Sequence, residues 1–237
     1  MTTVEALGNG MTGAAFIGGE GPSRERCAEI ARRADCIAAA DSGLILAEEA
    51  GITPDVIAGD MDSLREAEGG ESRLSKYPPE SIFRYPADKD LTDTEVAIGL
   101  LEERGCDEII LAGGGGGRLA HVLAIKALFE DEDARVSEWH TARERIMLLR
   151  GARSVRVGLA AGSVVSIFPV GGGPWSARSE GLKWGLEGVR WTRDSFGISN
   201  VALEDRISVE SRGGNFLMVM EAPRAHLVAY GAKPCAL

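Results

Sequence analysis

The sequence predicts an α/β protein, with a mainly parallel α/β domain at the N-terminus and an antiparallel β-sandwich at the C-terminus. Through about 140 residues, short apolar runs of strand length alternate with helical periods, which is typical of a parallel sheet covered by helices. From about residue 148 the helical periods stop, and short β-like segments follow that are separated by Gly, Pro and Asn. We therefore expect two domains, residues 1–149 and residues 150–237.

The first domain is predicted to begin with a strand and a helix, and this alternation then repeats. The helix over 23–34 places Cys27, Ile30 and Ala31 on one face, and Ser23 stands where an N-cap is expected. In order, the predicted elements are a strand at 13–19, a helix at 23–34, a strand at 35–43, a helix at 44–51, a strand at 54–63, a short strand around 82–83, a helix at 91–105, a strand at 107–114, a helix at 117–130 and a strand at 135–140. Because ligands bind outside the carboxyl ends of parallel strands, we expect residues that follow these strands to share one crevice.

The second domain is predicted to contain only strands. No helical period appears in it, and turn-forming residues separate its segments, as in a small antiparallel sandwich. The predicted β-like segments are 153–159, 163–170, 180–186, 189–192, 206–211 and 216–222.

The charge of the chain limits its partners. Acidic residues outnumber basic ones by 36 to 26, and the formal charge is −10. This charge argues against non-specific binding to nucleic acid or to an anionic membrane. It suits a cationic ligand, or an anionic ligand that arrives together with a metal ion.

The sequence contains no sign of export or of a membrane span. No segment approaches the roughly 18 continuous apolar residues that a spanning helix needs. The N-terminal stretch has neither a basic region nor a long apolar core, so we expect a cytoplasmic protein that does not bind membranes. The four cysteines show no CxxC motif and no metal-like spacing, so we expect buried free thiols.

Two aspartates, Asp60 and Asp62, stand at the end of the apolar run that reads IAGDMDSL. In an extended chain they would point to the same side, about 6–7 Å apart. At that spacing two carboxylates repel by roughly 2–3 kcal/mol at an effective dielectric of about 20. A bound cation would offset this repulsion.

A second group of acids, Asp88, Asp90 and Asp93, lies around the start of the predicted helix at 91–105. Acids in a first turn stabilise a helix by about 0.3–1 kcal/mol each, which explains this group when it is considered alone. It does not explain why two aspartates end a strand in the same crevice. An EF-hand loop is excluded, because its sixth position would be Asp93 rather than Gly and its twelfth position lacks Glu. We therefore expect Mg²⁺, which binds carboxylates together with substrate phosphates.

Five glycines at 113–117 connect a predicted strand to a predicted helix. Glycines let the backbone approach phosphate or ribose closely, and Arg118 at the helix start can add a phosphate contact. The run is not a Walker A motif, because no Gly-Lys-Ser/Thr follows. Gly115, Gly117 and Ala120 do satisfy G-x-G-x-x-A, which leaves a dinucleotide-dependent oxidoreductase as an alternative. That fingerprint normally occupies the first βα turn, however, and here it comes after several strands.

Several motifs together resemble those of the thiamine pyrophosphokinase (thiamine diphosphokinase) family. They occur in the order of the family and span most of the chain, and their combination is more specific than any one of them. The matching stretches are ADSG at 40–43, TPDVIAGDMDS at 53–63, DKDLTD at 88–93, GGGGGRLAH at 113–121, EGLKWGLE at 180–187, GISN at 197–200 and ISVES at 207–211.

The resemblance implies an enzyme that transfers a pyrophosphoryl group from ATP to the hydroxyl of thiamine and releases AMP. It implies Mg²⁺ as cofactor, ATP as co-substrate, an ATP- and Mg-binding catalytic domain and a thiamine-binding β-sandwich. It also implies a homodimer with the active site at the contact between subunits.

The motifs also imply the site residues. The implied metal-binding acids are Asp60, Asp62 and Asp93. The implied nucleotide or phosphate contacts are Asp41, Lys89, Asp90, Thr92, Gly115, Gly117 and Arg118. The implied thiamine contacts are Ser199 and Asn200. The residues expected to act in catalysis are Asp62, Asp93 and Arg118.

One position departs from the family pattern. Where the family usually has Asp, this chain has Ala120, between Leu119 and His121. On a helix, His121 points about 100° away from residue 120, so it is not a positional substitute. Two alternatives therefore stay open: a diphosphokinase for another alcohol, such as a hydroxymethylpterin, and a catalytically weakened regulator that binds nucleotide or thiamine.

Overall fold

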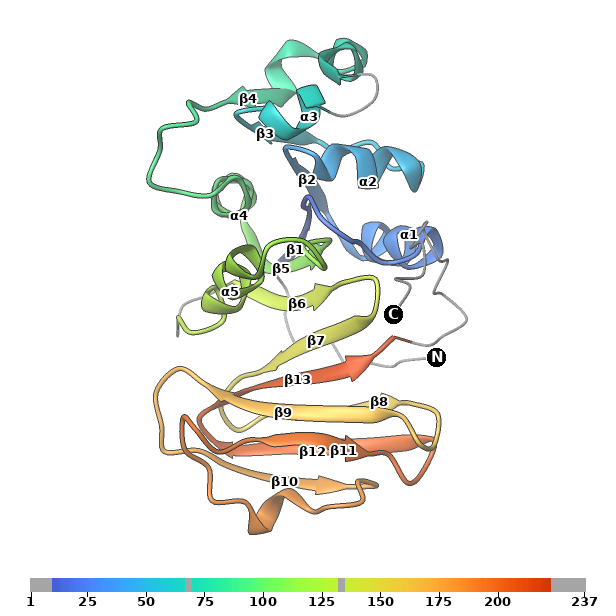
Figure 1. The fold of residues 1–237 in the computed structure, drawn as a ribbon, viewed down its shortest axis with the longest axis vertical. Coiled ribbons are helices and arrows are strands. Elements are labelled where there is room, and N and C mark those ends of the chain that lie inside the picture. Colours follow the sequence, from blue (N-terminus) through green and yellow to red (C-terminus); the bar gives the residue numbers. More distant parts are fainter. Residues whose placement is uncertain (1–9, 67–69, 132–134, 223–237) are drawn as a thin grey trace, which may run out of the picture.

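The computed structural model describes residues 10–66, 70–131 and 135–222 (Figure 1). Most of its strands form one ten-stranded sheet with the order β11-β9-β13-β7-β6-β5-β1-β2-β3-β4. The bounds of these strands are, in chain order, β1 (Met11–Phe16), β2 (Cys36–Ala40), β3 (Val56–Gly59), β4 (Ile82–Arg84), β5 (Cys106–Ala112), β6 (Val136–His140), β7 (Glu144–Leu149), β9 (Val164–Val170), β11 (Gly197–Val201) and β13 (Asn215–Glu221). A second sheet has the order β10-β12-β8 and consists of β8 (Ser154–Gly158), β10 (Ser176–Glu180) and β12 (Arg206–Gly213).

The half of the large sheet from β4 to β6 is parallel. The helices α1 (Arg24–Arg33) and α2 (Gly43–Glu49) lie on one of its faces, and α4 (Asp93–Glu103) and α5 (Leu119–Ala127) lie on the other (Figure 1). Successive residues of a strand point to opposite faces. In β1, accordingly, Ala14 and Phe16 belong to the core shared with α1, whereas Ala15 belongs to the core shared with α4. The predicted α/β class is confirmed.

The other half of the large sheet is antiparallel, and β7 joins the two halves. β7 pairs with β6 on one side and with β13 on the other, and β9 and β11 follow. The three-stranded sheet contributes Val157, Ala177 and Val209 to an apolar core that it shares with Ile167 and Phe216 of the large sheet. The predicted antiparallel β-sandwich is therefore present. Strands from before and after residue 150 belong to the same large sheet. The domain division at that position therefore stays a prediction.

Five segments differ from the sequence-based prediction, and two of them, β10 and β11, are strands where none was predicted. β7 was not predicted, because its charged first residues, Glu144 and Arg145, obscure the apolar pattern and its partner β13 lies about 70 residues away in the sequence. The expected strand at 180–186 is instead a turn followed by the short 3₁₀ helix η3 (Leu186–Gly188), because Gly181 has a φ of 79°. The expected strand at 189–192 has only an isolated bridge within its own turn.

The remaining elements are short and connect β3 to β4, the strand at one edge of the large sheet. They are α3 (Asp62–Glu66), η1 (Gly70–Lys76) and η2 (Pro79–Ser81). Ser23 caps α1 by accepting a hydrogen bond from the backbone of Arg26 (3.4 Å), as predicted. Within the described residues, no helix is long and apolar enough to cross a membrane.

The cysteines within the described residues are free and buried, as expected. They are Cys27, Cys36 and Cys106, and Cys235 lies outside the described residues. Burial raises the pKa of the Cys27 thiol to about 12. Because the thiolate is the reactive form, we expect Cys27 to be chemically inert at neutral pH.

Candidate active site

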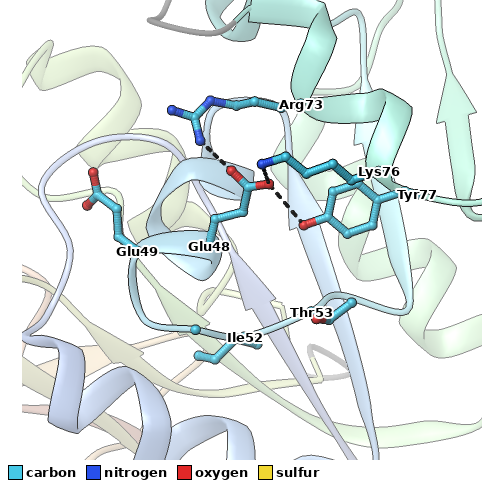
Figure 2. A pocket seen from close by; sticks show the side chains of 8 residues that line it. Glu48, Glu49, Ile52, Thr53, Arg73, Lys76 and Tyr77 are labelled. Carbon is cyan, nitrogen blue, oxygen red and sulfur yellow. Dashed lines mark hydrogen bonds and ion pairs between the residues drawn. The ribbon is translucent and has the colours of Figure 1, made fainter.

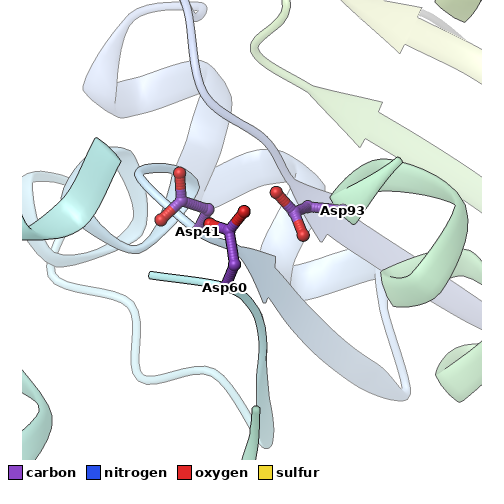
Figure 3. A group of neighbouring side chains, drawn as sticks. All are labelled: Asp41, Asp60 and Asp93. Atoms are coloured by element: carbon purple, nitrogen blue, oxygen red, sulfur yellow. The ribbon is translucent and has the colours of Figure 1, made fainter. Parts of the chain in front are cut away.

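Three aspartates meet at the carboxyl edge of the parallel strands (Figure 3). Asp41 follows β2, Asp60 follows β3, and Asp93 is the first residue of α4. One carboxylate oxygen of each residue lies within 4.8 Å of the others. At that distance two carboxylates repel by roughly 3–4 kcal/mol at an effective dielectric of about 20. The arrangement therefore calls for a positively charged partner.

The backbone conformation brings these carboxylates together. Gly59 has a φ of 144°, and a Cβ atom there would lie 3.2 Å from Cβ of Asp41 and 3.3 Å from Cγ of Asp93. Only glycine allows this close approach without strain. Asp41 itself has a φ of 46°, and its Oδ1 accepts a hydrogen bond from the backbone of Leu64 (3.2 Å), which fixes the carboxylate between β2 and α3.

Asp62 lies outside this group. The expectation of an extended chain through Asp60 and Asp62 is wrong, because Met61 between them has a φ of 64° and Asp62 begins α3. The backbone N–H of Asp62 donates to Oδ1 of Asp60 (3.0 Å). The carboxylate of Asp62 is 59% exposed and pairs with Arg65 (2.7 Å). Asp41 takes the third place in the cluster, and metal binding by Asp62 stays a prediction.

Lys89 supplies part of the missing positive charge. Its ammonium lies 2.8 Å from Oδ1 of Asp93, and its side chain is only 14% exposed. Among the described residues, this ion pair is the interaction that Oδ1 of Asp93, a buried oxygen, makes. Three carboxylates and one ammonium leave a formal charge of −2. A cluster of three carboxylates with this net charge fits a hard divalent cation such as Mg²⁺.

The other residues of the DKDLTD motif frame the start of α4. The hydroxyl of Thr92 accepts from the backbone of Glu95 (3.2 Å) and donates to its carboxylate (2.8 Å). The carboxylate of Glu95 also accepts from the backbone of Thr92 (2.7 Å), which completes a capping box. The Thr92 hydroxyl is therefore engaged in the cap. Asp90 is exposed beside it, and nucleotide contacts by both residues stay predictions.

Most of the glycine run is bonded to the rest of the sheet edge. Gly113 donates to the backbone of His140 (2.9 Å), and Gly114 donates to that of Gly18 (2.9 Å). Gly115 and Glu20 exchange two backbone hydrogen bonds (2.7 and 3.0 Å). The amide of Gly115 is thus already engaged. Gly117 has a φ of 64° and open space around it. Of the two glycines predicted to contact nucleotide, Gly117 is therefore the one that a ligand can approach.

These bonds identify a second loop that sequence reasoning missed. Gly18 and Gly19 come one residue after the end of β1, in the stretch IGGEG, and this loop lies against the run at 113–117. The side chain of Glu20 reaches Gly116, where a Cβ atom would lie 2.6 Å from its carboxyl carbon. The signal was present in the sequence, because two glycines stand at the end of the first buried strand.

Arg118 is exposed at the start of α5, and its guanidinium contacts the ring of His121 (2.6 Å). Ala120 is exposed one residue before His121, and the first turn of α5 contains no acidic residue. No carboxylate among the described residues forms an ion pair with Arg118. Its charge is therefore not neutralised by a carboxylate there.

The predicted thiamine contacts lie on β11 and differ in environment. Ser199 has a φ of 56°, is exposed, and donates its backbone N–H to the Ser166 hydroxyl (3.1 Å). Asn200 is only 3% exposed. Its carboxamide accepts from the backbone N–H of Trp184 (3.1 Å) and of Val201 (2.9 Å), and donates to the carbonyl of Trp184 (2.7 Å). Asn200 therefore fixes the loop that carries Trp184.

Trp184 was not among the predicted site residues. Trp184 is 55% exposed, and the ammonium of Lys183 lies 4.6 Å from the centroid of its ring. Exposed Ile198 and Phe196 precede Ser199 on the same segment. The buried carboxamide of Asn200 thus fixes the backbone that presents an exposed aromatic ring, and an aromatic ring can bind a cation over its face.

A buried charge network lies behind the glycine run, between α1, β6 and β7. The carboxylate of Glu138 binds Arg33, Arg145 (3.0 Å) and His140 (2.9 Å). His140 is 2% exposed, and its Nδ1 accepts from Arg26 (3.4 Å), so its Nε2 carries the proton that Glu138 accepts. Because the backbone of His140 holds Gly113, this network supports the glycine run.

This network predicts a pH dependence of stability. Burial lowers the pKa of His140 to about 4, below the ordinary value of about 6.5. Between these values the unfolded chain binds a proton that the folded chain does not, so stability falls as the pH falls. We expect the free energy of unfolding to decrease by about 2 kcal/mol from pH 7 to pH 5. Urea unfolding at both pH values measures it. An equal decrease in His140→Gln would contradict the assignment to His140.

A shallow pocket of about 510 Å³ lies at the far end of α2 (Figure 2). Its lining residues include Glu48, near the C-terminal end of α2, and Thr53, which precedes the first residue of β3. The pocket is therefore at the amino end of the strands, away from the three aspartates. The Glu48 carboxylate binds Arg73, Lys76 (3.2 Å) and the Tyr77 hydroxyl (3.3 Å), and so joins η1 to α2. The charged side chains of this pocket therefore have a structural role, which is to hold η1 against α2.

Comparison with known proteins gives a consistent result for both parts of the chain. Residues 27–136 match the family model described as thiamin pyrophosphokinase, catalytic domain, and residues 154–215 match the model of its vitamin B1 binding domain. Thiamine pyrophosphokinase of Bacillus subtilis is 37% identical over 83 residues, which are 35% of this chain and 37% of that protein. That match therefore spans little more than a third of the relative.

Solved structures of the same name share the fold. Thiamin pyrophosphokinase from Geobacillus thermodenitrificans superposes with a TM-score of 0.69 at 24% identity, covering 92% of this chain and all of that one. The Bacillus subtilis enzyme gives 0.70 at 21% identity, covering 90% and 99%. The Candida albicans enzyme gives 0.69 at 15% identity, covering 90% of each chain. From the match of both family models, one on each side of residue 150, the chain belongs to the thiamin pyrophosphokinase family.

Proposed function

We propose that this protein transfers the pyrophosphoryl group of ATP to the hydroxyl of thiamine, giving thiamine diphosphate and AMP. The observation that carries the proposal is the cluster of Asp41, Asp60 and Asp93 beside Lys89, at the edge of the sheet where ligands of α/β proteins bind. The two family models support the choice of acceptor.

The reaction requires positioning and charge neutralisation more than covalent chemistry. The thiamine hydroxyl oxygen forms a bond to the β-phosphorus of ATP, and the bond from this phosphorus to the oxygen of the α-phosphate breaks. The hydroxyl proton is released, and AMP leaves. Asp41, Asp60 and Asp93 would hold Mg²⁺, which when bound supplies positive charge to the triphosphate. Lys89 adds positive charge beside Asp93, and Arg118 would add a phosphate contact.

The sheet order supports a homodimer with shared sites. Asp60 follows β3, whereas Ser199 lies on β11, and these strands are eight positions apart in the large sheet. At about 4.8 Å per strand this separation is about 38 Å, far more than the length of a thiamine molecule. One chain therefore cannot offer both groups to one substrate pair, whereas a second copy can supply the missing half. Sedimentation as a monomer under assay conditions would contradict this part of the proposal.

One assay tests the function. Purified protein is incubated with Mg-ATP and single alcohols, and AMP is measured. We expect AMP release that depends on thiamine and on Mg²⁺. Release with a hydroxymethylpterin but not with thiamine would assign the enzyme to another acceptor. Binding of ATP and thiamine without AMP release would favour a regulator, for which Ala120 in place of the usual acid is the specific observation.

We predict that Asn200→Ala weakens thiamine binding and leaves ATP binding unchanged. The substitution removes two hydrogen bonds that hold the backbone of Trp184 and one to the backbone of Val201, and ordinary hydrogen bonds contribute about 0.5–1.5 kcal/mol each. We expect the dissociation constant of thiamine to rise at least about tenfold. Calorimetry with each ligand measures the effect, and Ser137→Ala on β6, which removes a side-chain hydrogen bond to the carbonyl of Ile109 (3.5 Å), serves as the control. Equal losses for ATP and thiamine would contradict the prediction.

A further inference from the structure

Arg118, a predicted phosphate contact, lies against the ring of His121 at the start of α5. We propose that His121 is a positioning residue, which orients the guanidinium of Arg118 toward the triphosphate without neutralising its charge. The proposal rests on the proposed function in one respect, namely that Arg118 contacts phosphate. Its basis is the 2.6 Å distance between Nη2 of Arg118 and Nε2 of His121.

The chemistry of the two groups fixes the protonation state of His121. A guanidinium has only N–H donors and no acceptor. Nε2 of His121 must therefore accept the hydrogen bond, and the ring is neutral with its proton on Nδ1. The ring accepts a hydrogen bond from Arg118 but, being neutral, does not cancel the positive charge of the guanidinium.

The backbone supports the same orientation. Arg118 is the N-cap residue of α5 but makes no side-chain cap, so its side chain is free to point elsewhere. The backbone N–H of His121 donates to the carbonyl of Arg118 (3.0 Å), which closes the first turn. Arg118 and His121 are thus joined by both backbone and side chain, across one helical turn. A long flexible side chain loses less entropy on binding phosphate when it is already held in place.

The start of α4, at the same edge of the parallel sheet, provides a contrast. There the N-cap residue Thr92 is held by the carboxylate of Glu95, three residues later. In α5 the corresponding residue is His121, and the first turn contains no acid. A carboxylate in place of His121 would also orient Arg118, but would cancel its charge. The neutral ring leaves the full charge for a triphosphate, which fits a chain whose formal charge of −10 repels free anions.

The test measures Mg-ATP binding by calorimetry without any alcohol, together with kcat and KM of AMP release. His121→Ala is expected to raise the dissociation constant of Mg-ATP about fivefold, because Arg118 loses its acceptor. His121→Gln retains a carbonyl acceptor and should stay within about twofold of the wild type. Thermal unfolding of each variant serves as the control for the fold.

A double-mutant cycle decides whether His121 acts through Arg118. Arg118→Ala alone should weaken Mg-ATP binding about tenfold or more, and adding His121→Ala should then have no further effect. A full fivefold loss from His121→Ala in the Arg118→Ala background would overturn the proposal, as would no effect of His121→Ala in the wild type. If no alcohol supports AMP release, the proposed function fails, yet the nucleotide binding data still test His121.

Discussion

Asp60→Asn is expected to abolish Mg-dependent turnover while the protein stays folded. The substitution removes one of three carboxylates whose oxygens lie within 4.8 Å of one another, and with it one unit of the negative charge that would hold Mg²⁺. Loss of one group that stabilises transition-state charge costs roughly 100- to 1,000-fold in kcat, and we expect a decrease at least of this order. The decrease should persist at saturating ATP.

The fold should survive this change. The Oδ1 atom of Asp60 accepts the backbone N–H of Asp62 (3.0 Å), and asparagine offers the same carbonyl oxygen. The repulsion from Asp41 and Asp93 also disappears, so the melting temperature should not fall. A melting temperature that rises or stays constant, with lost turnover, separates a role in metal binding from a role in folding.

Asp62→Asn is the matched control, two residues away in the same motif. Its carboxylate is exposed and paired with Arg65, so the structure leads us to expect a much smaller loss of turnover than in Asp60→Asn. Titration of Mg²⁺ in both variants measures the difference. If the folded Asp62→Asn protein loses turnover as completely as Asp60→Asn, Asp62 belongs to the metal site, as the motif resemblance implies. If Asp60→Asn retains its turnover and its Mg²⁺ dependence, the aspartate cluster is not the metal site.

The difference between these two aspartates illustrates what the sequence could predict. That acids follow β2 and β3 at one sheet edge could be predicted, because apolar runs mark the strands and parallel strands end together. That Asp60 and not Asp62 faces Asp41 could not, because it depends on a left-handed conformation at Met61. Methionine rarely adopts this conformation, and surrounding packing rather than local preference imposes it.

The second domain shows the same limit. Alternating apolar residues identified β8, β9, β12 and β13 within a few residues of their observed bounds. The role of Asn200 was not visible, because its partner Trp184 lies 16 residues away in a loop with no strand pattern. The hydrogen bonds of the glycine run likewise come from His140, Gly18 and Glu20, which are distant in the sequence. Long-range backbone pairing of this kind leaves no local periodicity.

The largest expected effect on stability comes from Glu138→Gln. Glu138 is 4% exposed, and its carboxylate is held between Arg33, Arg145 and His140. Burial alone would raise the pKa of this carboxyl, but the hydrogen bond from His140 and the charges of Arg145 and Arg33 hold it well below its usual range. The group is therefore ionised in the folded protein at neutral pH, and it compensates the charge of Arg145, whose side chain is only 12% exposed.

Glutamine has nearly the same shape but no charge, so it leaves the buried guanidinium of Arg145 uncompensated. Breaking a buried ion pair in this way costs about 3–5 kcal/mol. For a chain of this size we expect the melting temperature to fall by roughly 6–20 °C. Arg178→Gln on the exposed face of the small sheet is the matched control, because its pair with Glu210 (3.1 Å) is partly exposed and such pairs contribute about 0–1 kcal/mol. Because the network supports Gly113 through His140, the Glu138→Gln protein that remains folded at low temperature should also bind Mg-ATP more weakly. A melting temperature within 2–3 °C of the wild type, a shift of about 1 kcal/mol or less, would show that the network does not hold β6 and β7 against α1.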